Sequence, residues 1–328
     1  MFDVITIGSA TVDVFAKTHS ELVKIKTPKT EETLICYPSG AKILIKDLQF
    51  MTGGGGTNTA VAFSRLGLKT GYLGHLGKGE NGDKIISMFK KEKIKFLGTR
   101  GNEMTNYSMV LDSIEHDRTI LAYKEASQKL SYEKINKSTL KTKWFYISST
   151  LGQTFKTTEK LVSFAVKNGI KIAFNPSNYQ AEKGAKYLKK ILDNTNLLVL
   201  NKEEAELLLG RRYGTDLNEL LEGSHELGPK IVVITDGKEG AYCSDGKKKL
   251  KVIPRKINIL ETTGAGDAFA SSFLSGLIKK KDIKFALQMA VVNAQSVIQN
   301  YGAKNILLNW KQAIKEMKLR PRKIIGFK

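Results

Sequence analysis

Short segments rich in consecutive apolar residues alternate along the chain with longer segments whose apolar residues recur every three or four positions. The first kind is typical of strands buried on both faces: VITIG (4–8), WFYIS (144–148), IKIAFN (170–175), LLVLN (197–201) and KIVVIT (230–235). The second kind predicts helices, and TTEKLVSFAVKNG (157–169) keeps Leu161 and Phe164 on one side. Gly169 suits the end of that helix. The alternation predicts an α/β fold, with helices on both faces of a mostly parallel sheet.

Two regions interrupt this alternation. Residues 11–47 contain short β-like pieces without a helical pattern, and residues 105–125 read as a hairpin around the polar turn Glu115-His116-Asp117. We expect the two regions to pair into a small sheet separate from the main one. This sheet is either a lid over a site or a peripheral subdomain. The remainder forms the expected core: residues 1–10, 48–104 and 126–328.

The charge balance is strongly basic, with 53 lysines and arginines against 32 acids and a formal net charge of +21. The basic residues are scattered, which favours a solvated lysine-rich surface. The alternatives are a pocket for an anionic substrate and a surface that binds nucleic acid.

The two cysteines, Cys36 and Cys243, are far apart, which argues against a disulfide framework. The chain enters a strand at once and has no apolar run near the ~18 residues of a membrane span, so we expect a cytoplasmic protein.

Glycines and a carboxylate stand where a helix is expected to begin, in ETTGAGDAFASSFLSGL (261–277). The first N–H groups of a helix lack partners, and glycines let an anion approach them closely. Gly264, Ala265 and Gly266 are therefore candidates for a phosphate-binding cup. Asp267 beside them is a candidate to accept a proton from an attacking hydroxyl. The alternative is that Asp267 only caps the helix.

A second glycine-rich stretch, MTGGGGTNTAVAFSRLG (51–67), also runs into a predicted helix. It lacks the GK[ST] of a Walker A loop and the pattern of a GxGxxG dinucleotide fingerprint. The stretch is either a tight strand-to-helix turn or, with Asn58, a place where backbone and amide groups hold sugar hydroxyls.

Together the two stretches resemble the paired signatures of the ribokinase-like sugar kinases, the phosphofructokinase B-type (PfkB) family. Further matches follow in the family's order: GSATVD (8–13), NPS (175–177), NKEEAELLLG (201–210), TDGKEGA (235–241) and NYGA (300–303). The resemblance covers nearly the whole chain. It implies a three-layer α/β/α sandwich with a mostly parallel central sheet and a small β-sheet lid.

The resemblance also implies a role for each matching position. Asp267 would be the catalytic base, and Gly264, Ala265 and Gly266 would form the anion hole for the phosphoryl group. The substrate would contact Asp13, Gly53, Gly54, Asn58 and Asn175, with Arg118 of the hairpin as a further candidate. Asp13 and Arg118 also have simpler interpretations, as a loop-capping residue and a solvated arginine.

Asn201 and Glu204 match the family's N-x-x-E motif, which implies that they organise Mg²⁺ and the nucleotide phosphates, often through water. Without the resemblance, Glu204 is an ordinary acid of a first helical turn. The nucleotide would lie against Thr235, Gly237, Gly240 and Asn293.

Three positions depart from the family's pattern. Glu261 replaces the aspartate that usually opens the second signature. This argues against activation by K⁺, although Thr263 is retained and the two residues stay candidates for a monovalent cation. Gly55 replaces a lysine that ribokinases tend to carry, which weakens ribose as the substrate. The NPS at Asn175 lacks the D-x-N-x-R form of keto-deoxy sugar acid kinases, which weakens that class too.

The sequence thus predicts an ATP- and Mg²⁺-dependent kinase that phosphorylates a hydroxymethyl group of a sugar or sugar-like substrate. A nucleoside kinase of the same family is the first alternative. A catalytically idle binding protein with the same fold is the second. Membrane and nucleic-acid partners are not expected, whereas a homodimer through the lid is a further candidate.

Overall fold

The computed structural model describes residues 1–18, 21–26, 31–112, 118–300 and 302–327. Within these ranges ten strands form the main sheet, in the order β18-β17-β16-β15-β14-β13-β12-β1-β6-β8. All neighbours from β8 to β15 are parallel, and those from β15 to β18 are antiparallel. The strands are β1 (Phe2–Ile7), β6 (Thr70–Leu73), β8 (Lys95–Phe96), β12 (Thr142–Ile147), β13 (Lys171–Phe174), β14 (Leu197–Asn201), β15 (Ile231–Thr235), β16 (Ala241–Ser244), β17 (Lys249–Ile253) and β18 (Lys323–Gly326).

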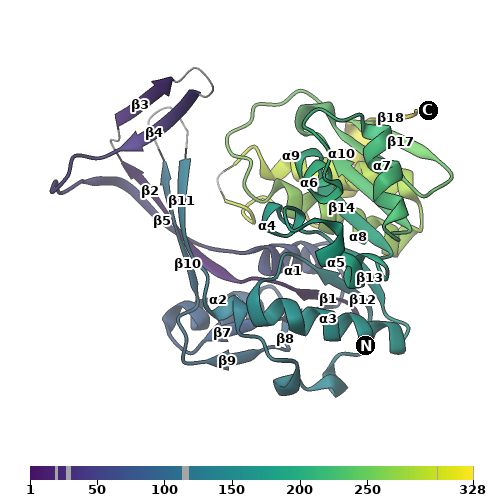
Figure 1. Ribbon diagram of the computed structural model, residues 1–328, viewed down its shortest axis with the longest axis horizontal. Helices are drawn as coiled ribbons and strands as arrows, with labels where there is room; N and C mark the ends of the chain where they lie inside the picture. Colours follow the sequence, from purple (N-terminus) through teal and green to yellow (C-terminus); the bar gives the residue numbers. More distant parts are fainter. Residues whose placement is uncertain (19–20, 27–30, 113–117, 301, 328) are drawn as a thin grey trace.

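Helices cover both faces of this sheet, which confirms the predicted three-layer α/β/α sandwich (Figure 1). Side chains of β1 show the two sides: Ile5 and Ile7 pack with α3, α5, α6 and α7, whereas Val4 packs with α1, α8 and α9. The helices are α1 (Gly55–Arg65), α2 (Glu80–Lys91), α3 (Gly152–Lys167), α4 (Asn178–Ala181), α5 (Gly184–Leu192), α6 (Lys202–Leu209), α7 (Leu217–Glu226), α8 (Ala265–Lys280), α9 (Ile283–Val297) and α10 (Trp310–Leu319). None of the described helices combines the length and the apolar character that crossing a bilayer requires.

The helix predicted from residue 157 begins earlier, at Gly152. Its first turns carry Thr154 and Thr157, which are buried and bond to the backbone of Leu130. These polar residues gave no apolar periodicity, so the start depends on tertiary contacts. Gly169 has a φ of 65° just after the helix, as its placement at the C-terminus predicted.

A separate four-stranded sheet projects from the core, in the order β11-β10-β2-β5 (Figure 1). The two interrupting regions therefore pair with each other, as predicted. The expected boundary at residue 47 is wrong, because β5 pairs with β2 as far as Gly53. The strands of this lid are β2 (Thr11–Thr18), β5 (Ile45–Gly53), β10 (Asn106–Asp112) and β11 (Arg118–Tyr123). Two smaller sheets pair β3 (Glu21–Lys26) with β4 (Glu31–Cys36), and β7 (His75–Gly77) with β9 (Thr99–Gly101). The predicted turn at 115–117 lies outside the described residues.

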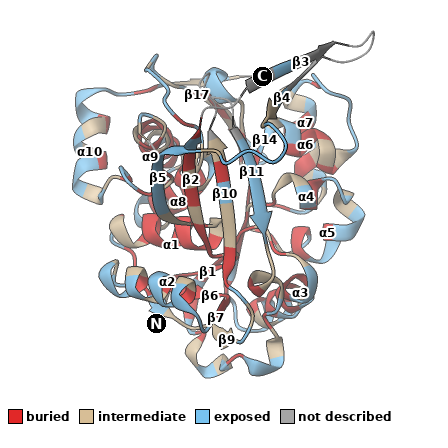
Figure 2. Cartoon of the chain, turned by 90° about the vertical axis from the view of Figure 1, so that its left-hand side faces the viewer, coloured by how far each residue is buried: buried red, intermediate tan, exposed pale blue. Residues whose placement is uncertain are grey.

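Register gives the lid two different faces. Asp13 is paired with Ser108 and Met51, and Ser108 lines the pocket described below. The next row, with Val14 opposite Phe50 and Met109, points to the other side, because side chains alternate along a strand. Figure 2 looks onto this outer face of the lid. The outer face of the lid exposes large apolar side chains: Leu48, Phe50, Met109, Leu121 and Tyr123.

Candidate active site

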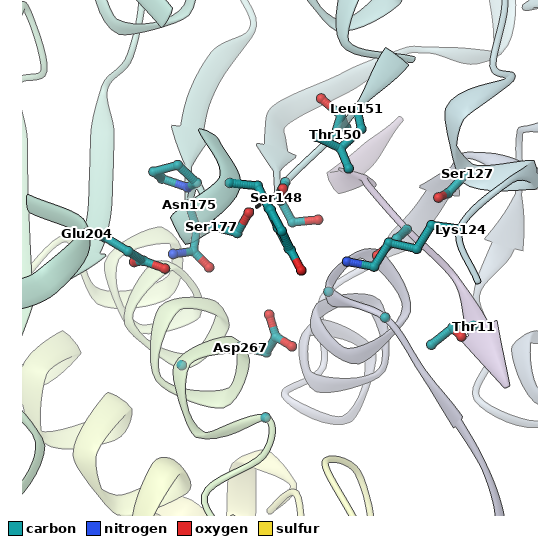
Figure 3. Close-up of a pocket in the computed structure, with 18 of the residues that line it drawn as sticks. Thr11, Lys124, Ser127, Ser148, Thr150, Leu151, Asn175, Ser177, Glu204 and Asp267 are labelled. Atoms are coloured by element: carbon teal, nitrogen blue, oxygen red, sulfur yellow. Dashed lines mark hydrogen bonds between the residues drawn. The ribbon is translucent and has the colours of Figure 1, made fainter. Parts of the chain in front are cut away.

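A pocket of about 420 Å³ lies at the carboxyl ends of the parallel strands, where ligands bind in open α/β sheets (Figure 3). Residues at or just beyond the ends of five strands form its wall: Ser9 after β1, Ser148 to Leu151 after β12, Asn175 to Ser177 after β13, and Asn201 and Thr235 at the ends of β14 and β15. The base of the lid adds Thr11, Asn106 and Ser108. The starts of two helices complete the pocket with Gly54, Gly55, Gly264, Gly266 and Asp267.

Asp267 points into this pocket from the first turn of α8 (Figure 3). It does not cap the helix, because Gly264 is the N-cap residue and no side chain caps that end. The Asp267 carboxylate instead accepts a hydrogen bond of 2.8 Å from Asn58 Nδ2 of α1. Burial raises the pKa of Asp267, while this hydrogen bond and the charge of Lys304 act in the opposite direction. The carboxylate is therefore fixed in direction and more basic than an ordinary aspartate.

The loop before α8 leaves backbone N–H groups free beside Asp267. In the described part of the chain, the amides of Gly266 and Asp267 have no partner, whereas Ala265 N donates to Thr262 O at 3.2 Å. Gly264 has a φ of 80°, and a Cβ on it would lie 2.3 Å from the Ala303 Cβ, so only glycine fits. These free amides suit an anion.

Glu261, at the start of the same loop, is buried, and its Oε2 accepts a hydrogen bond of 2.9 Å from Gly302 N. Thr263 is half-buried. The two residues predicted for a monovalent cation thus stand in the loop before α8, whose free amides suit an anion. One carboxylate oxygen of Glu261 is already bonded to the loop that contains Gly302.

The glycine run before α1 packs against the loop after β1. Gly54 has a φ of 94°, and a Cβ on it would lie 2.7 Å from Ser9 O. This confirms a tight strand-to-helix turn, and the same turn delivers Asn58 to Asp267. A Cβ on Gly53 would lie 1.7 Å from Asp13 Oδ2, so the backbone of the run also reaches the second acid.

Asp13 does not itself line the pocket, but it is hydrogen-bonded to Thr11 and Ser108, which do. Burial raises its pKa, and hydrogen bonds from Ser108 and Thr11 and the charge of Lys304 oppose that rise. Arg118 begins β11, but its side chain is outside the part of the chain that the structure describes. Asn175 lines the pocket, with its Nδ2 donating to Val199 O at 2.8 Å.

Asn201 and Glu204 form a capping box at the start of α6. Asn201 Oδ1 accepts from Glu204 N at 2.7 Å, and Glu204 Oε2 accepts from Asn201 N at 2.9 Å. Glu204 is therefore an acid of the first helical turn, as the simpler interpretation has it, but both residues also line the pocket. Figure 3 shows Glu204 at the edge of this pocket. Burial raises the pKa of Glu204 to about 7, and the charges of Glu203 and Asp267 add to the rise.

The residues predicted for the nucleotide are not all brought together. Thr235 lines the pocket, whereas Gly237 and Gly240 lie in the turn that follows and do not. Asn293 is 0% exposed: its Nδ2 donates to Ser272 Oγ at 2.8 Å and its Oδ1 accepts from Leu308 N at 2.9 Å. The expectation that the nucleotide lies against Asn293 is corrected, because this amide holds α8 and the segment before α10 together instead.

The family model described as pfkB family carbohydrate kinase matches residues 1–310. The chain belongs to the PfkB family of carbohydrate kinases. It is accordingly a sugar or nucleoside kinase, a phosphotransferase that acts on an alcohol group.

Similar proteins agree with membership in the PfkB family. An uncharacterized sugar kinase of Archaeoglobus fulgidus is 28% identical over 259 residues, which cover 74% of this chain and 97% of that protein. The Methanocaldococcus jannaschii nucleoside kinase superposes with a TM-score of 0.79 at 19% identity, covering 98% of this chain and 99% of that one. The Arabidopsis thaliana ribokinase complexed with ribose and ATP also has a TM-score of 0.79 at 19% identity, with 97% and 99% covered. The two structures share the ribokinase-like fold.

Two lysines near the site of this PfkB kinase were not predicted from the sequence. Lys124 follows β11 and directs its Nζ into the pocket, across from Glu204 (Figure 3). Its Nζ also lies 4.6 Å from the centre of the Tyr179 ring. Lys304 directly follows the NYGA match and is buried. Neither lies in a recognisable motif, and only the folded chain brings them to the site.

The donors in this pocket fit magnesium better than a metal held wholly by protein. Among the described residues, no group of three or more histidines, cysteines or acids is close enough to hold a metal ion. Asn201, Glu204 and Asp267 line the pocket and carry side-chain oxygen atoms. Mg²⁺ commonly takes few carboxylates and completes its shell with water and phosphate oxygens.

Proposed function

We propose that this PfkB kinase uses ATP to phosphorylate a hydroxymethyl group of a sugar, with Asp267 as the base. The observation that carries the proposal is the Asp267 carboxylate, fixed by Asn58 at 2.8 Å beside the free amides of Gly266 and Asp267. A base and an anion site side by side are what phosphoryl transfer to an alcohol requires.

In this mechanism Asp267 accepts the proton of the substrate hydroxyl as the oxygen attacks the γ-phosphorus. The new O–P bond forms while the bond between that phosphorus and the β–γ bridging oxygen breaks, and ADP leaves with the electron pair. The amides of Gly266 and Asp267, at the positive end of α8, stabilise the charge on the transferring group. Gly264 allows this approach. Ala265 contributes its amide only if its bond to Thr262 opens.

Asn201 and Glu204 are the proposed partners of Mg²⁺, through water. When bound, Mg²⁺ would neutralise part of the charge of the nucleotide phosphates. Thr235, Gly237 and Gly240 are proposed to support the nucleotide.

K⁺ is not proposed as a requirement for activity. Equal turnover in Na⁺ and K⁺ buffers would agree with this. Strong activation by K⁺ would instead argue for a cation at Glu261 and Thr263.

The pocket lining favours a sugar over a nucleoside. Hydroxyl and amide side chains dominate the lining, and Tyr179 is its one aromatic residue among those described, 57% exposed. Such a lining suits a polyol, whereas a purine favours stacking on aromatic rings. Asp13, Gly53, Gly54, Asn58 and Asn175 are the proposed sugar contacts, with Arg118 as a further candidate.

A substrate panel with coupled detection of ADP tests this function. Hexoses, pentoses, sugar acids, sugar phosphates and nucleosides are each supplied with ATP and Mg²⁺. ADP release that depends on a sugar agrees with the proposal. Release only with nucleosides would favour the nucleoside kinase, and no release with any member would leave a binding protein.

We also propose a homodimer through the outer face of the lid, whose exposed apolar row is Leu48, Phe50, Met109, Leu121 and Tyr123. Light scattering should give twice the 36.4 kDa chain mass. Phe50→Asp should reduce it to one chain, and a monomeric wild-type protein would refute the dimer.

A further inference from the structure

Lys304 lies in the segment between α9 and α10 and is only 8% exposed. Its Nζ donates three hydrogen bonds: to Thr52 O at 2.6 Å, to Thr52 Oγ1 at 3.0 Å and to Thr57 Oγ1 at 2.9 Å. An ammonium group has three donors, so all of them are used. One acceptor residue belongs to lid strand β5 and the other to core helix α1, so this side chain joins the lid to the core.

Thr52 and Thr57, which accept these hydrogen bonds, each stand next in sequence to a residue that contacts one of the two proposed site acids, Asp13 or Asp267. Thr52 precedes Gly53, whose backbone packs against Asp13 Oδ2. Thr57 precedes Asn58, which donates to Asp267 Oδ2 at 2.8 Å. Thr57 Oγ1 also donates to Gly53 O at 2.6 Å, which closes the connection between the two sides. A continuous path of contacts thus runs from Asp13 through Lys304 to Asp267.

The backbone of Lys304 is held as well. Arg65, at the end of α1, donates from Nη1 to Lys304 O at 2.6 Å and pairs with Glu92 at 2.6 Å. The charged groups that face Lys304 are therefore Asp13 on β2, Asp267 on α8, Glu92 after α2 and Arg65 on α1. Burial lowers the pKa of Lys304 to about 7, and the three acids oppose that shift.

We propose that Lys304 is a positioning residue, which ties lid strand β5 to the glycine turn and so fixes the distance between Asp13 and Asp267. The inference rests on the proposed function, because it takes Asp13 as a substrate contact and Asp267 as the base. Lys304 itself touches no reacting atom. It acts through Thr52 and Thr57, and its charge favours the ionised, proton-accepting form of Asp267.

Lys304→Met tests this role, because methionine has a similar volume but no charge and no donor. We expect kcat/KM for the sugar to fall about 100-fold, the loss that a misplacement of about 1 Å can cause, with a smaller change in the KM for ATP. The acidic limb of the pH profile of kcat/KM should move to higher pH, because the charge that lowers the pKa of Asp267 is gone. A purely structural lysine would not move that limb.

Thr57→Val provides a second variant that keeps the lysine and removes its acceptor on the core side. The two substitutions should be non-additive in kcat/KM, since they break one connection. Lys311→Met, at an exposed position of α10, is the matched control and should leave activity unchanged. Amide hydrogen exchange should be faster in β5 of Lys304→Met than in β5 of the wild type.

The outcomes separate the two proposals. An inactive wild-type protein would overturn the proposed function. An active wild type with unchanged kcat/KM, pH profile and β5 exchange in Lys304→Met would overturn the positioning role alone.

Discussion

Asn58 Nδ2 donates a hydrogen bond of 2.8 Å to Oδ2 of Asp267, although the two residues are 209 positions apart. This contact joins the two glycine-rich stretches of the chain, so that the turn before α1 orients the carboxylate at the start of α8. A carboxylate held in this way presents its other oxygen to the pocket.

Asn58→Ala should lower kcat about 10-fold to 100-fold, because Asp267 loses its orientation. The acidic limb of the pH profile should also move to higher pH, because the variant loses the hydrogen bond that lowers the pKa of Asp267. Steady-state kinetics between pH 5 and 9 measure both effects. Asn168→Ala, on an exposed residue after α3, is the control. Unchanged kcat and pH profile in Asn58→Ala would contradict this role.

Glu204 should make the unfolding free energy depend on pH. Its pKa is about 7 in the folded protein against an ordinary 4.5, so between these values the folded chain binds more protons than the unfolded chain. Stability from this group is full below about pH 4.5 and is lost as pH rises through 7, by about 3 kcal/mol. In Glu204→Gln that decline should be smaller, whereas Glu80→Gln, an exposed first-turn acid of α2, should behave like wild type. Urea unfolding without nucleotide or Mg²⁺, from pH 4.5 to 8, is the measurement. Equal slopes for wild type and Glu204→Gln would count against a buried, protonated Glu204.

Gly264→Ala should reduce both stability and turnover. The φ of 80° disfavours any side chain, and the new Cβ would collide with Ala303, so the anion loop must move. Gly210→Ala is a matched control, since Gly210 has a φ of 63° but nothing within 4 Å of an added Cβ. We expect the control to lose about 1 kcal/mol of unfolding free energy with normal turnover. Gly264→Ala should lose more, and its turnover should fall at least 10-fold. Equal turnover in the two variants would show that the loop does not depend on this close approach.

Local patterns were sufficient to predict β1 and β12 to β15, because buried parallel strands are continuous apolar runs and their connections are helices. The shorter strands β6 and β8 and the antiparallel strands β16, β17 and β18 were not predicted. The lid was predicted as a separate sheet, but the end of its first segment at Gly53 was not predicted. Residues 48–53 were grouped with the glycine run, whereas pairing with β2 keeps them in the strand.

The site was predictable only where a motif carried it. Asp267, Gly54 and Glu204 stand in recognisable stretches and do meet in one pocket. The contacts of Lys304 with Thr52 and Thr57 join parts of the chain about 250 positions apart, and no local signal reports them. Asn293 is the opposite case. It was predicted to contact the nucleotide, but its amide group bonds Ser272 and Leu308 inside the protein.

The most direct test of the central claim is the turnover of Asp267→Asn with the best substrate of the panel. Asparagine keeps the shape of the side chain and cannot accept the proton. Turnover should fall about 10²-fold to 10⁴-fold, while nucleotide binding measured by calorimetry stays close to wild type. Near-normal turnover in Asp267→Asn would contradict its role as the base.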